Sequence, residues 1–373
     1  MRRKCRFAYF ISPHGFGHAA RAAAVMEALH TMDETVEFDI FTSVPSWFFE
    51  TSLTKSFHYH FLVTDVGFAQ NTPLESDLEE TLARLDRFYP VEESAVSDLA
   101  SFLLERRCAM VICDIAPMGI LVAKHACLRS VLVENFTWDW LYEAYLPEEA
   151  RFEKVILTLS KLFGLADFHV QTEPVCLPGK ARLTTAPVSR KPRLNPEEVK
   201  DRLGIPKGAK VVLITMGGIP ERYPFLQNMG TLRDVYFVLP GLGEKLQVQE
   251  NRVCLPHRSE FFHPDLVNAS DALIGKVGYS TLAETYFAGI PFGYIARHHF
   301  RESAVLVSFA RETMQGIPIK EKDFYTGTFL SSVPRLLSMP RVERTGPNGA
   351  EQVARFILDR LAAVRRDVQI DRK

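Results

Sequence analysis

The sequence predicts an α/β fold with two doubly wound, Rossmann-like domains that face each other across a cleft. Its 373 residues are too many for one ordinary hydrophobic core and suit two domains of similar size. Short apolar runs without alternation, separated by helix-length segments, are typical of parallel strands that helices cover on both faces. This pattern fails between about Leu177 and Pro206 and restarts at Lys210, which indicates a second domain.

The first half of the chain contains five predicted strands. The first of them ends at Pro13-His14-Gly15-Phe16-Gly17, and an alanine-rich helix begins near His18. Helix-length segments such as Glu79 to Arg106 separate the later runs. The five runs are Arg6–Ser12, Val36–Thr42, Met110–Cys113, Ser130–Val133 and Phe168–Gln171.

The predicted domain boundaries come from a proline-rich, positively charged stretch around Pro187 to Pro196. We expect an N-terminal domain at residues 1–186, a linker at 187–206 and a C-terminal domain at 207–346. The last helix, within 347–373, carries an apolar stripe that we expect to pack back toward the N-terminal domain. The strands predicted for the C-terminal domain are Lys210–Thr215, Val235–Leu239, Arg252–Leu255, Ala272–Ile274 and Phe292–Ile295.

The composition is that of an ordinary globular protein. Charged residues make up 24% and the net charge is -1, so we expect no nucleic acid among its partners. The 6 cysteines form no CxxC pair, which favours a reducing compartment, and we expect a cytoplasmic protein. No stretch reaches the roughly 20 uninterrupted apolar residues of a spanning helix, and the apolar run after the basic start is too short for a signal peptide.

The turn after the first predicted strand is the first candidate site. His14, Gly15, Phe16 and Gly17 form this turn, which we expect to line the cleft. Its two glycines let the backbone approach a ligand closely, and the next helix directs N–H groups and its positive dipole end toward that ligand. The turn lacks the GxGxxG spacing of a dinucleotide site.

His18 and Asp114 are the predicted catalytic residues. Ligands bind at the carboxyl ends of parallel strands, and a histidine there can take a proton from a hydroxyl near neutral pH. The alternative is that His18 only caps its helix. Asp114 ends another apolar strand of the same sheet, so its carboxylate can hold His18 in one tautomer and stabilise its cation. The alternative for Asp114 is a helix N-cap.

The most specific motif runs from Ser270 to Pro291. A strand ends in glycines and a helix begins at Ser280-Thr281, so its first N–H groups are available for a diphosphate. Glu284 lies one turn into that helix, where its carboxylate can accept hydrogen bonds from a ribose diol. A purely structural role for the glycines and for Glu284 is the alternative.

The same stretch carries a resemblance to a known family. Residues Phe262 to Leu306 resemble the donor-binding half of GT-B glycosyltransferases, including the lipid-linked GlcNAc transferase of peptidoglycan synthesis. They are more similar still to the glycosyltransferase-like N-terminal region of plant arabinose kinases. A turn similar to His14–Arg21 also opens the chain in that group. We expect no sugar-kinase domain to follow here.

The resemblance implies roles for individual residues. It implies that His18 is the base, that Gly217-Gly218 lies near the donor phosphates, and that Glu284 binds the ribose. The family's proline-rich run before its sugar-contacting polar pair is replaced here by residues 297–302. In this segment Arg301 can neutralise a diphosphate and Glu302 can bond sugar hydroxyls, or both can belong to a solvated turn. The predicted donor site is Gly217, Gly218, His257, Lys276, Gly278, Tyr279, Ser280, Thr281, Glu284, Arg301 and Glu302.

The predicted function is sugar transfer from a nucleotide diphospho-sugar, with UDP the expected nucleotide, to a small-molecule, glycan or lipid-linked acceptor. We expect no cofactor and no metal, because a helix N-terminus and basic side chains can stabilise a departing diphosphate. The alternatives are a nucleotide-sugar epimerase or hydrolase and a sugar-nucleotide-binding protein without catalysis. Aromatic clusters at 47–49 and 136–142 fit core packing, an acceptor platform or peripheral membrane contact.

Overall fold

The computed structural model describes residues 4–70, 72, 74–217, 223–297 and 299–370, with the backbone alone from 365 onward. The chain divides into two compact units. The first unit is Met1–Ala69, Ser76–Ser189 and Gly346–Lys373, and the second is Gln70–Glu75 and Arg190–Thr345. The division after Ser189 lies inside the segment 187–206 that the sequence predicts as a linker.

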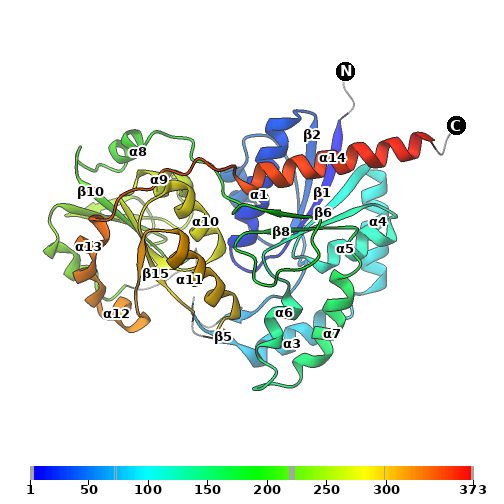
Figure 1. Cartoon of the computed structure of the whole chain (residues 1–373), viewed down its shortest axis with the longest axis horizontal. Coiled ribbons are helices and arrows are strands. Elements are labelled where there is room, and N and C mark those ends of the chain that lie inside the picture. The colour runs from blue at the N-terminus through cyan, green and yellow to red at the C-terminus, as the bar shows by residue number, and fades with distance from the viewer. Residues whose placement is uncertain (1–3, 71, 73, 218–222, 298, 371–373) are drawn as a thin grey trace. The chain divides into compact units, whose positions relative to one another are not determined.

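A seven-stranded sheet forms the centre of the first unit (Figure 1). Its strand order is β3-β2-β1-β6-β7-β8-β9, and all of its neighbouring strands run parallel. The five strands predicted for this half are present, whereas the short strands at the two edges were not predicted. The strands are β1 (Cys5–Ile11), β2 (Val36–Thr42), β3 (His58–Phe61), β6 (Cys108–Asp114), β7 (Ser130–Glu134), β8 (Phe168–Thr172) and β9 (Leu183–Thr185).

Helices accompany the strands of the first unit. The last helix, α14, packs along α1, as Figure 1 shows. The segment from Glu79 to Arg106 forms two helices, because Pro90 has no N–H group with which to continue the first one. The helices are α1 (Gly17–Met32), α2 (Ser46–Ser52), α3 (Leu78–Phe88), α4 (Glu93–Glu105), α5 (Pro117–His125), α6 (Trp138–Glu143), α7 (Phe152–Phe163) and α14 (Gly349–Ile370).

The strand that carries the first candidate site is buried on both faces. Phe7 to Ile11 of β1 have no exposed surface, which explains why this run does not alternate between apolar and polar residues. β1 lies between β2 and β6 in the middle of the sheet. The turn that follows Ile11 is therefore attached to a buried central strand of the sheet.

The second unit is built around another seven-stranded sheet, of order β12-β13-β11-β10-β14-β15-β16. All of its neighbouring strands are parallel except β12, which runs antiparallel to β13 at the edge. The strands are β10 (Lys210–Thr215), β11 (Val235–Pro240), β12 (Gln247–Gln249), β13 (Arg252–Leu255), β14 (Ala272–Lys276), β15 (Phe292–Ile295) and β16 (Gly316–Pro318). A separate two-stranded sheet pairs β4 (Ala69–Gln70) with β5 (Ser76–Asp77).

The helices of the second unit include one inside the predicted linker, α8, which Asn195 caps by accepting a hydrogen bond from the N–H of Glu197. A core of buried side chains, among them Phe225, Phe237 and Phe324, packs against the sheet. Each unit is thus a doubly wound α/β layer structure, which confirms the predicted fold class. The helices are α8 (Pro196–Arg202), η1 (Leu226–Thr231), α9 (His263–Ala269), α10 (Tyr279–Ala288), α11 (Arg301–Thr313), α12 (Glu321–Thr326), η2 (Thr328–Ser332) and α13 (Val333–Leu337).

Candidate functional site

The turn between β1 and α1 places His18 at the carboxyl end of the first sheet. Gly15 has a φ of +68°, a conformation that glycine adopts without strain. α1 begins at Gly17, and Phe16 at its N-cap provides no side-chain hydrogen bond. The first turn of α1 contains no acidic residue. The positive end of the helix dipole is therefore not offset by a carboxylate of its own first turn.

His18 and Asp114 lie together, as the sequence predicts. Asp114 is the last residue of β6 and pairs with Ile11 of β1, so the two site residues share one sheet edge. His18 Nδ1 lies 3.0 Å from Asp114 Oδ1, and both residues are buried. The N-cap of α5 is Ala116, so Asp114 does not serve as the N-cap of that helix.

The backbone beside Asp114 is strained. Ile115 has a φ of +40°, and a β-branched residue is a genuine outlier in this region. The residue is fully buried, and its N–H donates to the carbonyl of Val133 at 3.4 Å. The neighbouring strand therefore helps to fix the backbone that holds the carboxylate.

Arg21 is a third member of this cluster that sequence reasoning missed. It is 1% exposed, and it donates to both oxygens of Asp114: Nε to Oδ2 at 2.8 Å and Nη2 to Oδ1 at 2.6 Å. Its Nη1 also donates to Asn135 Oδ1 at 2.7 Å. Burial alone would raise the pKa of Asp114, but the charge and hydrogen bonds of Arg21, together with His18, lower it below its ordinary value. Asp114 is therefore ionised at neutral pH.

The contacts of His18 determine which of its ring nitrogens carries the proton. Asp114 is a carboxylate and can only accept, so the 3.0 Å contact assigns the proton to Nδ1. The other neighbour of Nδ1, Nη2 of Arg21, is farther away at 3.4 Å. The described residues give Nε2 of His18 no hydrogen bond. This nitrogen consequently carries the lone pair that can accept a proton.

The ring of His14 carries its proton on the other nitrogen from that of His18. Its Nδ1 accepts a hydrogen bond from the backbone N–H of Phe68 at 3.3 Å, so the neutral ring carries its proton on Nε2. Gly67 has a φ of +60°, and a Cβ there would lie 2.8 Å from Cβ of His14, which is why this position suits glycine. In their neutral forms, the rings of His14 and His18 thus carry their protons on different nitrogens.

Asp65 is a second buried carboxylate at this edge and was also missed. It is 1% exposed and accepts hydrogen bonds from Ser12 Oγ at 3.0 Å and from Trp138 Nε1 at 2.9 Å. Burial raises the pKa of Asp65 to about 7, with Asp114 adding to the effect and the two hydrogen bonds opposing it. The Trp138 ring contacts His14 and His18 edge-on, with centroids 5.2 and 5.9 Å away. Asp65 is therefore linked to both histidines through Trp138.

In the second unit, Lys276 lies between two of the predicted donor-site glycines. Gly217 has a φ of +77°, and a Cβ there would lie 3.3 Å from Nζ of Lys276. A Cβ on Gly278 would lie 4.0 Å from Cε of the same side chain. The pKa of Lys276 is lowered to about 7, chiefly by burial and also by the charge of Arg297, while Glu302 opposes the shift. Gly218, the partner of Gly217 in the predicted glycine turn, lies outside the described residues.

The helix that the sequence assigns to diphosphate binding is α10. Its N-cap, Gly278, offers no side-chain bond, and its first turn contains Tyr279, Ser280 and Thr281 but no acidic residue. The N–H groups of this turn are therefore not capped by the residue before the helix. Gly275, just before them, is needed for close packing, because a Cβ there would lie 1.9 Å from the carbonyl oxygen of Thr215.

Glu284 has two side-chain partners, Arg190 and His263, that sequence reasoning did not anticipate. It is 4% exposed; its Oε1 accepts from Nε of Arg190 at 2.9 Å, and its Oε2 lies 2.6 Å from Nδ1 of His263. Burial alone would raise the pKa of Glu284, but Arg190 and His263 lower it below its ordinary value. A ribose that bonds to Glu284 must share these oxygens with Arg190 and His263.

The remaining predicted donor residues lie at ends of neighbouring elements of the second unit. His257 is exposed and follows β13, and its Nδ1 would lie 3.9 Å from a Cβ on Gly241 after β11. Arg301 and Glu302 begin α11; Arg301 is exposed, whereas Glu302 is buried and acts electrostatically on Lys276. Glu302 and Lys276 are thereby brought together.

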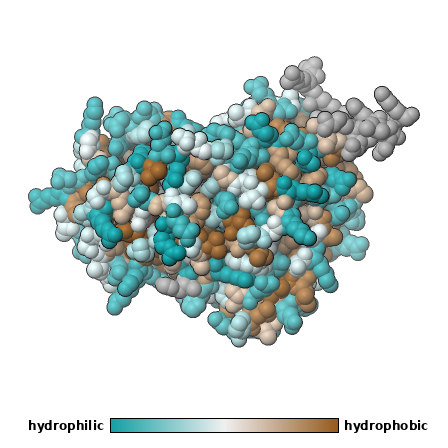
Figure 2. All heavy atoms as spheres, viewed as in Figure 1, coloured by the Kyte–Doolittle hydropathy of each residue, from teal (hydrophilic) through white to brown (hydrophobic). Residues whose placement is uncertain are grey.

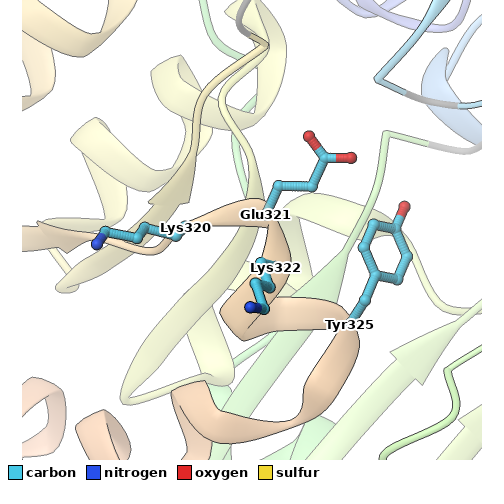
Figure 3. A pocket seen from close by; sticks show the side chains of 4 residues that line it. All are labelled: Lys320, Glu321, Lys322 and Tyr325. Carbon is cyan, nitrogen blue, oxygen red and sulfur yellow. The ribbon is translucent and has the colours of Figure 1, made fainter.

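A shallow hollow of about 530 Å³ lies elsewhere in the second unit, around α12. Figure 3 shows that Glu321 and Tyr325 extend to one side of it while Lys320 points away. None of the predicted site residues lines this hollow, and its polar groups do not converge. Within the described part of the chain, no cluster of three or more His, Cys, Asp or Glu side chains has the geometry of a metal site.

The predicted aromatic clusters of the first unit belong mostly to its core. Phe48, Phe49, Trp138, Trp140 and Tyr142 are all buried. On the face in Figure 2, hydrophilic residues are interspersed with smaller groups of hydrophobic ones. No helix among the described residues is long and apolar enough to cross a membrane.

Comparison with solved structures identifies the fold class. MurG of Acinetobacter baumannii superposes with a TM-score of 0.53 at 13% identity, covering 95% of this chain and 99% of that one. UGT2 of Phytolacca americana, solved with UDP-2-fluoro-glucose and pterostilbene, gives 0.59 at 10% identity, covering 96% and 94%. A putative UDP-N-acetylglucosamine 2-epimerase from Listeria monocytogenes gives 0.54 at 12% identity, covering 95% of both chains. The chain has the GT-B fold, as its motifs predict.

In sequence, the chain is similar to the L-arabinokinase of Arabidopsis thaliana, with 26% identity over 362 residues. The alignment covers 94% of this chain and 34% of that protein, so the chain spans about a third of the length of this relative. The resemblance inferred from the two motifs therefore extends over nearly the whole chain. No family model matches the sequence.

Proposed function

We propose that the protein transfers a sugar from a nucleotide diphospho-sugar to an acceptor hydroxyl, with His18 as the base. The observation that carries the proposal is the contact of His18 Nδ1 with Asp114, which leaves Nε2 as the proton acceptor at the carboxyl edge of the sheet. The acceptor oxygen attacks C1 of the sugar, its proton passes to Nε2, and the bond from C1 to the diphosphate oxygen breaks. The electron pair of that bond leaves with the diphosphate.

The second unit supports the donor half of the proposal. Lys276 and the N-terminus of α10 provide positive charge and N–H groups for the diphosphate, and Gly217 and Gly278 leave room beside the lysine. These groups can stabilise a leaving diphosphate without a metal ion. We propose UDP as the nucleotide because one structural neighbour was solved with UDP-2-fluoro-glucose and another is a putative UDP-N-acetylglucosamine 2-epimerase. The proposed site of action is the cytoplasm, and the acceptor is a small molecule, a glycan or a lipid-linked molecule.

The test is a donor panel followed by a transfer assay. UDP-hexoses and UDP-pentoses should be compared by thermal shift, since the sequence relative is named for a pentose. The best donor is then incubated with acceptor pools, with and without EDTA. His18→Ala should lower turnover about 1000-fold while nucleotide binding is retained. His125→Ala, at an exposed position in the same unit, is the matched control and should leave turnover unchanged.

A second candidate function is epimerisation or hydrolysis of the nucleotide sugar. The structural likeness to a putative UDP-N-acetylglucosamine 2-epimerase favours it, and Glu302 offers an acidic group beside Lys276. This function requires a changed or cleaved donor without any acceptor. Product formation from the donor alone at the rate of transfer would replace the glycosyltransferase proposal. Nucleotide binding without any turnover of the donor would instead indicate a non-catalytic sugar-nucleotide-binding protein.

A further inference from the structure

We propose that Arg21 is a positioning residue that determines the pH at which the His18–Asp114 pair takes up a proton. The inference rests on the proposed function only in that it concerns the same base. Arg21 lies one turn after His18 on α1, so both side chains leave the same face of the helix. The side chain of Arg21 is almost fully buried and lies beside the buried carboxylate of Asp114.

Geometry makes Arg21 the main partner of Asp114. The guanidinium donates twice to the carboxylate, at 2.8 and 2.6 Å, in the two-point arrangement that is strongest between these groups. His18 has only one contact with Asp114, at 3.0 Å, and it shares Oδ1 with Nη2 of Arg21. Asn135 holds the far side of the guanidinium at 2.7 Å. Arg21 therefore fixes the orientation of the carboxylate through more contacts than His18 makes with it.

The charges of the cluster then oppose protonation of His18. Arg21 and Asp114 cancel each other, so the buried cluster is neutral while His18 is neutral. A proton on Nε2 adds an uncompensated positive charge, and the guanidinium nitrogen Nη2 is only 3.4 Å from Nδ1. In a histidine-aspartate pair without this cation, the carboxylate would offset the imidazolium.

Among the described residues beside the cluster, the ionisable groups Tyr9, Asp65 and His14 do not place a carboxylate in contact with His18. Tyr9 on β1 is fully buried, and its raised pKa keeps the hydroxyl neutral. Asp65, on the segment after β3, bonds to Ser12 and Trp138 rather than to His18. His14, in the turn, receives the N–H of Phe68. The rings of Phe136 and Trp138 against His18 are uncharged. Within the described part of the chain, Arg21 is thus a cation in direct contact with both His18 and Asp114.

The experiment measures proton uptake at His18 directly, by NMR titration of ¹⁵N-labelled imidazoles in the full chain, with the His18 signals assigned by His18→Asn. In Arg21→Gln, which keeps hydrogen-bonding groups but removes the charge, the titration midpoint should rise by about one pH unit. The acid limb of kcat/KM should move by the same amount. In Arg21→Lys, which keeps the charge, the midpoint should move by less than about half a unit.

A second variant leaves Arg21 in place. Asn135→Asp adds a carboxylate where Nη1 of Arg21 already binds, and it should also raise the midpoint. Arg106→Gln is the matched control, because Arg106 also pairs with a buried aspartate, Asp39, at 3.1 Å but lies in a different cluster. It should leave the titration of His18 unchanged.

An unchanged or lowered midpoint in folded Arg21→Gln, or in Asn135→Asp if the former does not fold, would overturn the inference. The outcome is independent of the proposed function, since the titration is read without substrate. If His18→Ala retained full turnover, the base assignment would fail while the shift in Arg21→Gln would still stand.

Discussion

Arg190 and Glu284 form a mostly buried ion pair in the second unit, with Nε of the arginine 2.9 Å from Oε1 of the glutamate. Nδ1 of His263 lies 2.6 Å from the other carboxylate oxygen, Oε2. The resemblance to glycosyltransferases assigns this same glutamate to the ribose of the donor. The pair gives Glu284 a structural role that exists without any ligand, so the two roles must be separated by experiment.

Glu284→Gln should lower both stability and ribose recognition. Removing the charge of Glu284 breaks its ion pair with Arg190, and breaking such a pair in the protein interior costs about 3 kcal/mol of unfolding free energy. If Glu284 also accepts a ribose hydroxyl, the wild type should bind UDP about tenfold more tightly than 2′-deoxy-UDP, and the variant should lose this preference. Calorimetric titration and urea unfolding measure the two effects.

The control for this experiment is Arg190→Gln, which removes the same ion pair from its other side. It should be destabilised to a similar extent but keep a preference for the ribose hydroxyl. A Glu284→Gln variant that still distinguished UDP from its deoxy analogue would contradict the ribose role and leave Glu284 as a structural residue.

The sequence predicted the central strands of both sheets and the positions of His18 and Asp114. It succeeded there because a strand buried on both faces must be continuously apolar, and because ligands bind where such strands end. β10, β13 and β15 have the bounds that were predicted. The edge strands β3 and β9 were missed, since they are short and contain polar residues.

The partners of the site residues could not be predicted in the same way. Arg21 is 93 positions from Asp114, and Arg190 is 94 positions from Glu284. No local pattern connects such residues, because their contact depends on how the helices pack on the sheet. Arg21 nonetheless stands at i+3 from His18, and this spacing was a usable signal that an arginine shares the face of the histidine.

Nucleotide binding should depend on pH through Lys276. Its pKa of about 7 means that roughly half of the free protein carries the ammonium at pH 7, and a diphosphate binds that form better. Affinity for UDP should therefore be highest below pH 7 and weaken about tenfold between pH 7 and 8.5 as the amine loses its proton. Calorimetric titration over this range measures the slope.

Lys276→Met should bind UDP weakly with a flat pH profile above 7. Lys322→Met, which removes an exposed lysine of the same unit, should keep the slope of the wild type. An equally steep slope in Lys276→Met would show that another group titrates on binding.

Gly275→Ala should disrupt the sheet of the second unit. The new Cβ would lie 1.9 Å from the backbone oxygen of Thr215, and β10 and β14 would have to separate to relieve the clash. A loss of at least about 3 kcal/mol is expected, measured as a lower Tm or as insoluble protein. Gly346→Ala, where a Cβ meets nothing within 4 Å, should change Tm little. Equal Tm values for the two variants would contradict the close approach.

Asp65 should make the protein less stable as pH rises. Burial raises the pKa of this carboxyl to about 7 in the folded protein, from 3.8, so the folded chain retains a proton that the unfolded chain has released. Between these two values stability falls with pH, and it stays at the lower level above pH 7. Asp65→Asn has no such proton and keeps a hydrogen-bonding group for Ser12 and Trp138. From pH 4.5 to 7.5 the variant should therefore gain about 2 to 4 kcal/mol relative to the wild type in urea unfolding.

Asp167 provides a control for which stability should change with pH in the opposite direction. Burial alone would raise the pKa of Asp167. The hydrogen bonds from Arg129 and Ser130, together with the charge of Arg129, nevertheless lower it below its ordinary value. The stability that Asp167 contributes is therefore present above pH 3.8 and lost as pH falls through the lowered value. Asp167→Asn should consequently lose stability relative to the wild type as pH rises from 3 to 5, whereas Asp65→Asn gains. If Asp65→Asn followed the trend of Asp167→Asn, the carboxyl of Asp65 would already be ionised at low pH. The group that Trp138 links to the two histidines would then be negatively charged throughout this pH range.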